Sequence, residues 1–318
     1  MARGEAGGLA PFVSGAADLV DSCAVTTAPQ ASRPIAAPRL LRAGRHTLSR
    51  PLIMGVVNVT PDSFSDGGLF YEAARAIEHA RRLAAEGADI LDIGGESSRP
   101  GAQAVPLEEE RRRVLPVLEA IVPLGVPVSV DTYKPELMRE AVAAGAAMIN
   151  DIFGLRRPGA LEAVAAGEAA VCIMHMQGEP RSMQQAPRYD DVVAEVREFL
   201  LARAAVAVAA GIARERIVLD PGFGFGKTPE HNLELIRALP RLAGAGYPLL
   251  AGLSRKSLFG TIVGRPAAER VHASVAGALL AAQRGASILR VHDVAATRDA
   301  LLVLRAIEDS HYVPGERN

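Results

Sequence analysis

The sequence contains little cysteine, almost no net charge and no long apolar run. Its two cysteines, Cys23 and Cys172, are too few for a disulfide framework or a thiolate zinc site, so a reducing cytoplasm is the expected location. A formal net charge of -1 gives no overall attraction to nucleic acid or to an anionic membrane surface. No stretch approaches the roughly 18 apolar residues of a membrane span. These absences favour a protein whose anionic partners are small molecules.

The composition is that of a folded chain with one weakly patterned end. Hydrophobic residues make up 49% of the 318 and charged residues 22%, which predicts a large buried core. Residues 1–45 are rich in Ala, Gly, Ser and Pro without a sustained period, so we expect a flexible extension there. The remainder predicts one domain over residues 46–312 and a short tail over 313–318.

From residue 51 onward, short β-type runs alternate with amphipathic helical patterns. The expected strands lie within residues 52–59, 89–95, 126–131, 146–151, 169–175, 216–220, 248–254 and 287–293. Eight strands with right-handed helical crossovers close into a barrel, whereas an open doubly wound sheet normally has fewer strands and a nucleotide fingerprint in its first turn. The predicted fold class is therefore α/β, a (β/α)8 TIM barrel.

Prolines mark several expected helix boundaries. Pro135 and Pro229 are each followed by a glutamate, the pattern of a first helical turn. Pro116 lies inside the helical pattern of residues 111–120, where it lacks the N–H of a regular helix. We therefore expect Pro116 to kink or divide that helix.

Polar side chains stand at nearly every expected strand end. In α/β barrels the active site lies where strands end and the following loops begin. A single Asp or Asn after a strand is more often a helix cap or turn former, but here the pattern recurs around the whole barrel. These positions predict one shared site: Asn58, Ser98, Arg99, Asp131, Asn150, Asp220, Lys256, Arg290 and His292.

Lysine is rare, because the chain has only Lys134, Lys227 and Lys256. The first two follow strand ends near expected helix starts, and we interpret them as solvated first-turn residues. Lys256 directly follows an apolar run, where its ammonium can donate to both a substrate carbonyl and a carboxylate.

Two patterns resemble functional motifs without matching them. "PGFGFGKT" is similar to a phosphate loop, but Pro221 stands where that motif requires glycine, so an ATP site is not expected. His175 and His292 have no third histidine or carboxylate at zinc-like spacing, so a zinc enzyme is not expected.

The strand-end groups suit two kinds of ligand chemistry. Asp131, Asp220, Asn150 and Lys256 mix acceptors and donors, which matches a flat heterocycle bearing amino and oxo groups. Hydroxyl, guanidinium and imidazole donors for phosphate oxygens come from Ser98, Arg99, Arg290 and His292. The carbonyl oxygen of Asn58 is a candidate Mg²⁺ ligand, because this ion prefers oxygen and often contacts phosphate.

Eight ordered segments resemble the dihydropteroate synthase family of pterin-binding barrels. They read "MGVVNVTPDSFSDGG", "DIGGESSRPGA", "VSVDTYKPE", "MIND", "MHMQGEP", "LDPGFGFGKT", "GLSRKS" and "RVHD" and cover about residues 51–310. The resemblance implies a (β/α)8 barrel that condenses (7,8-dihydropterin-6-yl)methyl diphosphate with 4-aminobenzoate. The expected products are 7,8-dihydropteroate and diphosphate.

The resemblance also assigns roles to individual positions. It implies a pterin pocket made by Asp131, Asn150, Asp220 and Lys256, with Asp131, Asp220 and Lys256 as the catalytic set. It implies a diphosphate site made by Asn58 with Mg²⁺, Ser98, Arg290 and His292. It implies a 4-aminobenzoate pocket, where sulfonamides compete, made by Phe64, Pro100, Phe225 and Ser257. A homodimer is expected by the same resemblance.

One residue departs from the family pattern, because Ser98 stands where the family commonly has threonine. Serine keeps the hydroxyl and loses a methyl group. Two alternatives remain at this point: a pterin-binding methyltransferase barrel, which would not need the diphosphate group at Arg290 and His292, and a catalytically silent paralogue that binds pterin.

Overall fold

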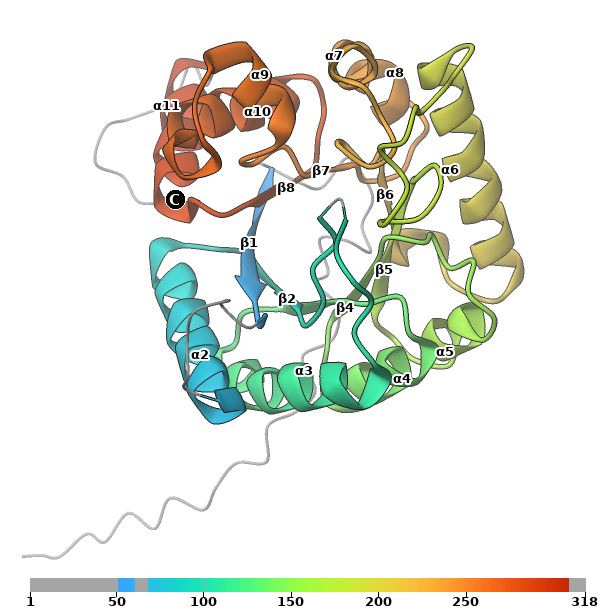
Figure 1. The fold of residues 1–318 in the computed structure, drawn as a ribbon, viewed down its shortest axis with the longest axis vertical. Coiled ribbons are helices and arrows are strands. Elements are labelled where there is room, and N and C mark those ends of the chain that lie inside the picture. Colours follow the sequence, from blue (N-terminus) through green and yellow to red (C-terminus); the bar gives the residue numbers. More distant parts are fainter. Residues whose placement is uncertain (1–50, 61–67, 100, 309–318) are drawn as a thin grey trace, which may run out of the picture. The chain divides into compact units, whose positions relative to one another are not determined.

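The computed structural model of the chain describes residues 51–60, 68–99 and 101–308. Strands alternate with helices along this part of the chain (Figure 1). The eight strands are β1 Leu52–Asn58, β2 Ile90–Gly94, β3 Val128–Asp131, β4 Met148–Asp151, β5 Ala170–Met174, β6 Ile217–Asp220, β7 Leu250–Ala251 and β8 Ile288–Val291. Each lies within a range predicted from the sequence, which confirms the strand assignments.

All paired strands run parallel, in the order β6-β5-β4-β3-β2-β1-β8-β7. A parallel bridge between Leu219 and Leu249 brings the two ends of this sheet together. Figure 1 shows the helices on the outside of the ring of strands, as expected when each crossover is helical. The predicted (β/α)8 barrel is confirmed.

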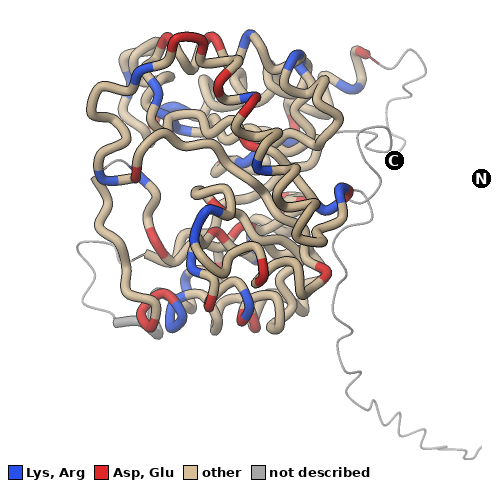
Figure 2. The backbone as a smooth tube through the Cα atoms, turned by 90° about the vertical axis from the view of Figure 1, so that its right-hand side faces the viewer, with Lys and Arg blue, Asp and Glu red and all other residues tan. Residues whose placement is uncertain are grey.

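The helices differ in length, from five residues in α8 to 19 in α2. They are α2 Gly68–Glu86, α3 Leu107–Ile121, α4 Pro135–Ala143, α5 Ala160–Ala165, α6 Val192–Ala209, α7 Pro229–Arg237, α8 Leu239–Ala243, α9 Ser257–Val263, α10 Val271–Gln283 and α11 Val294–Glu308. Pro135 and Pro229 occupy the first position of α4 and α7, as predicted. Positive and negative residues are interspersed over the face seen in Figure 2.

The prediction that Pro116 divides its helix is wrong. Helix α3 runs without interruption from Leu107 to Ile121 with Pro116 inside it. The missing N–H removes one backbone hydrogen bond, but Val114, Val117 and Leu118 are fully buried on the same helix. Packing of this apolar face against the barrel supplies most of the stability of such a helix, so the loss is tolerated.

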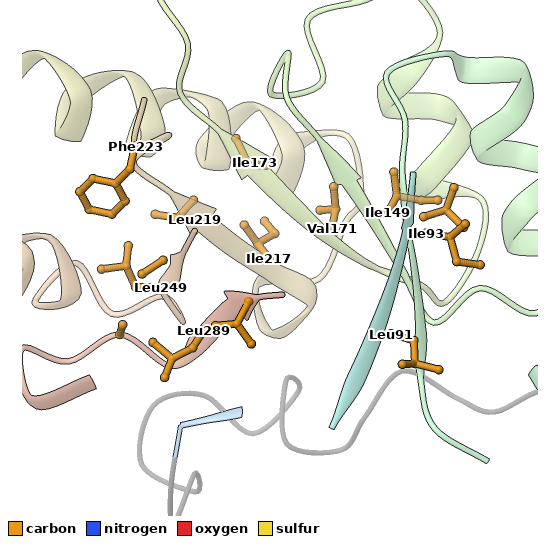
Figure 3. Packing of buried hydrophobic residues seen from close by; sticks show 14 of the residues in the cluster. Leu91, Ile93, Ile149, Val171, Ile173, Ile217, Leu219, Phe223, Leu249 and Leu289 are labelled. Carbon is orange, nitrogen blue, oxygen red and sulfur yellow. The ribbon is translucent and has the colours of Figure 1, made fainter. Parts of the chain in front are cut away.

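One apolar layer lies outside the ring of strands and another inside it, because successive side chains of a strand point to opposite faces of the sheet. The outer layer packs the strands against the helices and contains Ile93, Ile149, Val171 and Leu219 (Figure 3). The inner layer fills one end of the barrel with Leu52, Met54, Ile90, Met148, Ala170, Cys172, Val218, Leu250 and Ile288. We call this inner layer the apolar floor of the barrel, because the polar residues described below lie directly above it.

Candidate active site

The carboxyl ends of the strands surround one cavity of about 950 Å³. Eleven side chains predicted for the site line it: Asn58, Ser98, Arg99, Asp131, Asn150, Asp220, Phe225, Lys256, Ser257, Arg290 and His292. The other two, Phe64 and Pro100, lie outside the described residues. Side chains from seven strand ends and their loops therefore meet in one place, although more than two hundred residues separate the first from the last.

Strand periodicity explains how the polar groups reach this cavity. On four strands the next inward position, two residues beyond a floor residue, is polar: Asp92 follows Ile90, Asn150 follows Met148, Asp220 follows Val218, and Arg290 follows Ile288. Because all strands are parallel, these positions form a polar layer above the apolar floor. The cavity is thus closed below by hydrocarbon and lined above it by hydrogen-bonding groups.

Arg290 is held between two carboxylates that come from different strands. Its Nε donates to Oδ2 of Asp92 over 2.6 Å, and its Nη2 donates to Oδ2 of Asp131 over 2.9 Å. Burial disfavours the cation, but Asp92 and Asp131 outweigh this effect and raise the pKa of Arg290. Arg290 therefore stays charged and faces the same groups that were predicted to bind the heterocycle.

Asp92, which the sequence prediction missed, does not line the cavity but contacts two residues that do, Arg290 and Asn150. It is fully buried, accepts the Arg290 hydrogen bond on Oδ2, and receives a long one of 3.4 Å from Nδ2 of Asn150. Its Oδ1 and the hydroxyl of Ser129 have no hydrogen-bond partner within the described part of the chain. One signal was available, because Asp92 is the single charge inside the apolar run "ILDIG".

Asp131 is a carboxylate whose ionisation is finely balanced. Burial raises its pKa to about 7, while the Arg290 guanidinium acts in the opposite direction and Asp92 adds like-charge repulsion. The group lies at the wall of the cavity. A carboxylate in this state responds strongly to any positive charge that develops beside it.

Asp220 and Lys256 form the opposite wall of the polar layer. Oδ1 of Asp220 accepts a hydrogen bond of 2.7 Å from the backbone N–H of Gly222, and burial raises the pKa of Asp220. Burial, followed by the charge of Arg290, lowers the pKa of Lys256 to about 8. Nζ of Lys256 lies 4.2 Å from the centroid of the Phe225 ring, a cation–π contact.

His292 lies at the end of β8 and is fixed by Ser254. The Ser254 hydroxyl is 3.0 Å from Nδ1 of His292 and accepts a hydrogen bond of 3.2 Å from its backbone N–H. Burial, then the charge of Arg290, lowers the pKa of His292 to about 4. Near neutral pH the imidazole is therefore uncharged and offers a hydrogen bond, rather than a full charge, to an anionic ligand.

The interpretation of Lys134 and Lys227 as solvated first-turn residues is wrong. Lys134 is mostly buried and forms ion pairs with Glu96 and Glu110. Lys227 is 3% exposed and its ammonium contacts Nδ1 of His175 at 3.0 Å, besides backbone oxygens of the loop after β6. Burial lowers the pKa of Lys227 to about 7. Sequence position alone gave no sign that these ammonium groups turn inward.

Asn58 is exposed at the end of β1 and lines the cavity. No group of three His, Cys, Asp or Glu side chains that could hold a metal ion occurs among the described residues. A single amide oxygen suits Mg²⁺ only as one ligand among several, with the rest supplied by water and by a phosphate-bearing ligand. The donor set thus fits an ion that arrives with a diphosphate, and does not fit a metal cage made by protein alone.

The sequence profile of the family described as "Pterin binding enzyme" matches residues 54–292. The chain is 54% identical over 273 residues to a dihydropteroate synthase of Neisseria meningitidis serogroup C, covering 84% of this chain and 96% of that protein.

Two solved structures combine high identity with the same fold. The Burkholderia cenocepacia dihydropteroate synthase complexed with 7,8-dihydropteroate is 55% identical with a TM-score of 0.76, covering 82% of this chain and 92% of that one. The Xanthomonas albilineans dihydropteroate synthase with 4-aminobenzoic acid is 58% identical with a TM-score of 0.78, covering 83% and 96%. The predicted family is confirmed, and the chain belongs to the pterin-binding enzymes of the dihydropteroate synthase family.

Proposed function

We propose that this chain is a dihydropteroate synthase, which joins (7,8-dihydropterin-6-yl)methyl diphosphate to 4-aminobenzoate in folate biosynthesis. The observation that carries the proposal is the cavity at the carboxyl end of the barrel, which unites ring-binding and anion-binding groups above one apolar floor. Membership of the family and the two ligand-bound relatives support it.

The proposed pterin pocket is the polar layer of the cavity. The carboxylate of Asp220 accepts N–H bonds from the amino edge of the ring, the amide of Asn150 both donates and accepts, and the ammonium of Lys256 donates to the oxo group. Asn150 and Asp220 are buried on strands, so their positions are set before the ligand arrives.

The proposed diphosphate site lies at the rim, where Ser98, His292 and Asn58 face the cavity. Ser98 supplies a hydroxyl and His292 a neutral imidazole donor. Arg290 adds positive potential from below, although its guanidinium is bonded to carboxylates. Mg²⁺ held by Asn58 and phosphate oxygens would neutralise charge on the leaving group.

The proposed reaction begins when the bond between the methylene carbon and the diphosphate oxygen breaks, and the electron pair leaves with diphosphate. Positive charge then spreads into the dihydropterin ring. When Asp92, Asp131, Asp220, Arg290 and Lys256 are all ionised, the polar layer carries one negative charge in excess, which favours this cation. Asp131 is the proposed stabilising carboxylate.

The second substrate is proposed to enter beside Phe225, Arg99 and Ser257, which line the cavity. The aniline nitrogen of 4-aminobenzoate is neutral near pH 7, so it attacks the methylene carbon without a strong base. A C–N bond forms and the nitrogen then releases one proton to water. The protein contributes mainly position and electrostatics.

We further propose a cytoplasmic homodimer. Exposed apolar side chains on α10 and α11 support an interface between copies, because such patches usually mark contact surfaces: Leu280, Leu302, Val303 and Ile307. Light scattering after gel filtration tests the dimer.

Among the described residues no helix has the length and hydropathy to cross a bilayer. The balanced charge gives no reason to expect a nucleic-acid partner.

One assay tests the proposed activity. Purified protein is incubated with the dihydropterin diphosphate, 4-aminobenzoate and Mg²⁺, and both diphosphate and 7,8-dihydropteroate are followed over time. Stoichiometric formation of the two products is expected, with loss of rate after chelation of Mg²⁺ and competitive inhibition by a sulfonamide against 4-aminobenzoate. A folded protein that binds pterin but releases no diphosphate would contradict the proposal and indicate a silent paralogue.

A further inference from the structure

The loop after β2 is built directly against helix α3. Residues 95–99, here called the β2 loop, carry Ser98 and Arg99 to the cavity. A Cβ atom at Gly95 would lie 2.7 Å from Cγ2 of Val114, so only glycine fits there without a shift. Nη1 of Arg113 donates a hydrogen bond of 2.9 Å to the carbonyl oxygen of Gly95. The first residue of the loop is therefore fixed to α3.

The next residue, Glu96, lines the cavity but has both carboxylate oxygens occupied by the protein. Oε1 accepts from the hydroxyl of Tyr133 over 2.9 Å. Oε2 accepts from Nζ of Lys134 over 2.6 Å and from the backbone N–H of Val105 over 3.0 Å. A carboxylate so engaged, beside a region proposed for diphosphate, serves to hold the loop and not to bind the anion.

Lys134 joins this loop to a second buried acid. Its ammonium forms ion pairs with Glu96 and with Glu110 of α3, and Glu110 is 1% exposed. Nζ also lies 4.6 Å from the centroid of the Tyr133 ring. Without this ammonium, two carboxylates would face each other in a partly dry space, and a buried charge left unpaired is strongly unfavourable.

The position of Lys134 in the chain makes the bridge useful. It follows Asp131 of β3 by three residues, and the β2 loop carries the residues proposed for diphosphate and 4-aminobenzoate. The Glu96–Lys134–Glu110 bridge thus ties the strand of the ring pocket to the loop that serves the other substrate groups. Small displacements between such groups have large effects on rate.

We propose that Lys134 is a positioning residue, which acts through Glu96 to hold Ser98 and Arg99 at the distance from the pterin pocket that the condensation requires. The inference rests on the proposed dihydropteroate synthase activity. The ammonium of Lys134 is engaged by Glu96 and Glu110 and contacts no substrate. Its removal is expected to impair the use of 4-aminobenzoate while the pterin pocket stays intact.

The test separates positioning from mere stability with a pair of variants. Lys134→Gln leaves Glu96 and Glu110 facing each other, so both thermal stability and activity are expected to fall. The double variant Lys134→Gln/Glu110→Gln removes the unpaired buried charge as well, so its melting temperature should return to within about 3 °C of wild type. Lys134→Arg keeps the cation and is expected to recover most of the activity.

Steady-state kinetics then decide the question. At saturating dihydropterin diphosphate, the KM of the stable double variant for 4-aminobenzoate should be about tenfold higher than that of the wild type. The Kd of 6-hydroxymethyl-7,8-dihydropterin, measured by calorimetry, should stay within about twofold of wild type because this probe carries no diphosphate. Arg112→Gln, an exposed change on the same helix, should alter neither quantity.

Two results would overturn the inference. One is a double variant with wild-type KM and kcat, which would make the bridge purely structural. The other is an equal loss of pterin affinity and 4-aminobenzoate use, which would mean that Lys134 supports the whole barrel mouth. Both are distinct from failure of the proposed function, which would show as an inactive wild-type protein.

Discussion

Nη2 of Arg290 donates a hydrogen bond of 2.9 Å to Oδ2 of Asp131, although 159 residues separate them in the chain. The same guanidinium binds Asp92 through Nε, so one cation is shared by two carboxylates. The single positive charge of Arg290 cannot neutralise both carboxylates, and burial keeps the pKa of Asp131 raised. This arrangement prepares Asp131 for a second positive charge, the one that forms when diphosphate leaves.

Asp131→Asn should therefore lower turnover far more than pterin affinity. The amide keeps the shape and can still accept from Arg290, but it lacks the charge that stabilises the cation. We expect kcat to fall about 100-fold and the Kd of 6-hydroxymethyl-7,8-dihydropterin to change less than about threefold. Single-turnover kinetics and calorimetry measure the two quantities. Asp299→Asn, an exposed change on α11, is the control, and equal losses in rate and affinity would contradict this role for Asp131.

The pH dependence of kcat/KM for the dihydropterin diphosphate, which reports groups of the free enzyme, should be a narrow bell. Burial, opposed by Arg290, raises the pKa of Asp131 to about 7, so its carboxylate forms as pH rises through that value. Burial and then the charge of Arg290 lower the pKa of Lys256 to about 8, so its ammonium is lost above it. The two limbs should fall near these values.

Lys256→Arg distinguishes the two limbs of that bell. A guanidinium stays protonated throughout the accessible range, so the basic limb should move above about pH 9 while the acidic limb stays in place. Values of kcat/KM for the dihydropterin diphosphate, measured from pH 5.5 to 10, give both limbs. A flat wild-type profile between pH 6 and 9.5 would show that neither group titrates in the reaction.

Replacing Lys227 should destabilise the fold, and increasingly so at higher pH. Lys227→Met removes donors from the carbonyl oxygens of Gly222 and Phe225 and from Nδ1 of His175, with an expected loss of about 2 kcal/mol at pH 7. Burial lowers the folded-state pKa of Lys227 to about 7, below an unfolded value of about 10.4. The unfolded chain thus binds more protons, and wild-type stability rises with pH across this window.

Lys227→Met lacks this rise in stability with pH. The difference in unfolding free energy between wild type and Lys227→Met should therefore grow by about 2 kcal/mol between pH 7 and 9. Urea unfolding at both pH values measures it. Arg237→Met, an exposed change on α7, should stay within about 0.5 kcal/mol of wild type at both. A constant difference between the two pH values would mean that Lys227 is not the group whose pKa is lowered.

Gly222→Ala should disrupt the loop after β6. Gly222 has φ of +68°, and a Cβ atom there would lie 1.9 Å from the carbonyl oxygen of His175, a clash that the backbone must move to relieve. Gly211→Ala is the matched control, because its φ is +93° but nothing lies within 4 Å of its Cβ position. We expect a loss of about 1 kcal/mol for the control and more than about 3 kcal/mol for Gly222→Ala in urea unfolding.

The strands and most cavity residues were predictable because they depend on local patterns. Apolar runs bounded by Asn58, Asp131 or Asp220 identify strand ends, and parallel strands bring such ends together whatever the details of packing. Asp92 was missed because its partner Arg290 is 198 residues away, so nothing near it in sequence indicates why a charge is buried there. Lys134 was misjudged for the same reason, because its partners Glu96 and Glu110 are 38 and 24 residues away.

At Pro116 a local sequence rule gave a wrong prediction. Local rules for proline favour a break, but the buried face of α3 holds the helix together across it. Tertiary packing overrides a local preference when the apolar area at stake is large.

Taken alone, the amino-acid order determined the eight-strand alternation, the ring of polar strand ends and the family resemblance, because each is written in short-range periodicity and motif. Only the folded barrel decided which charges neutralise one another: Arg290 with Asp92 and Asp131, and Lys134 with Glu96 and Glu110. Pairing of this kind depends on distance and burial in space, and residues far apart in the chain acquire both only when the sheet closes.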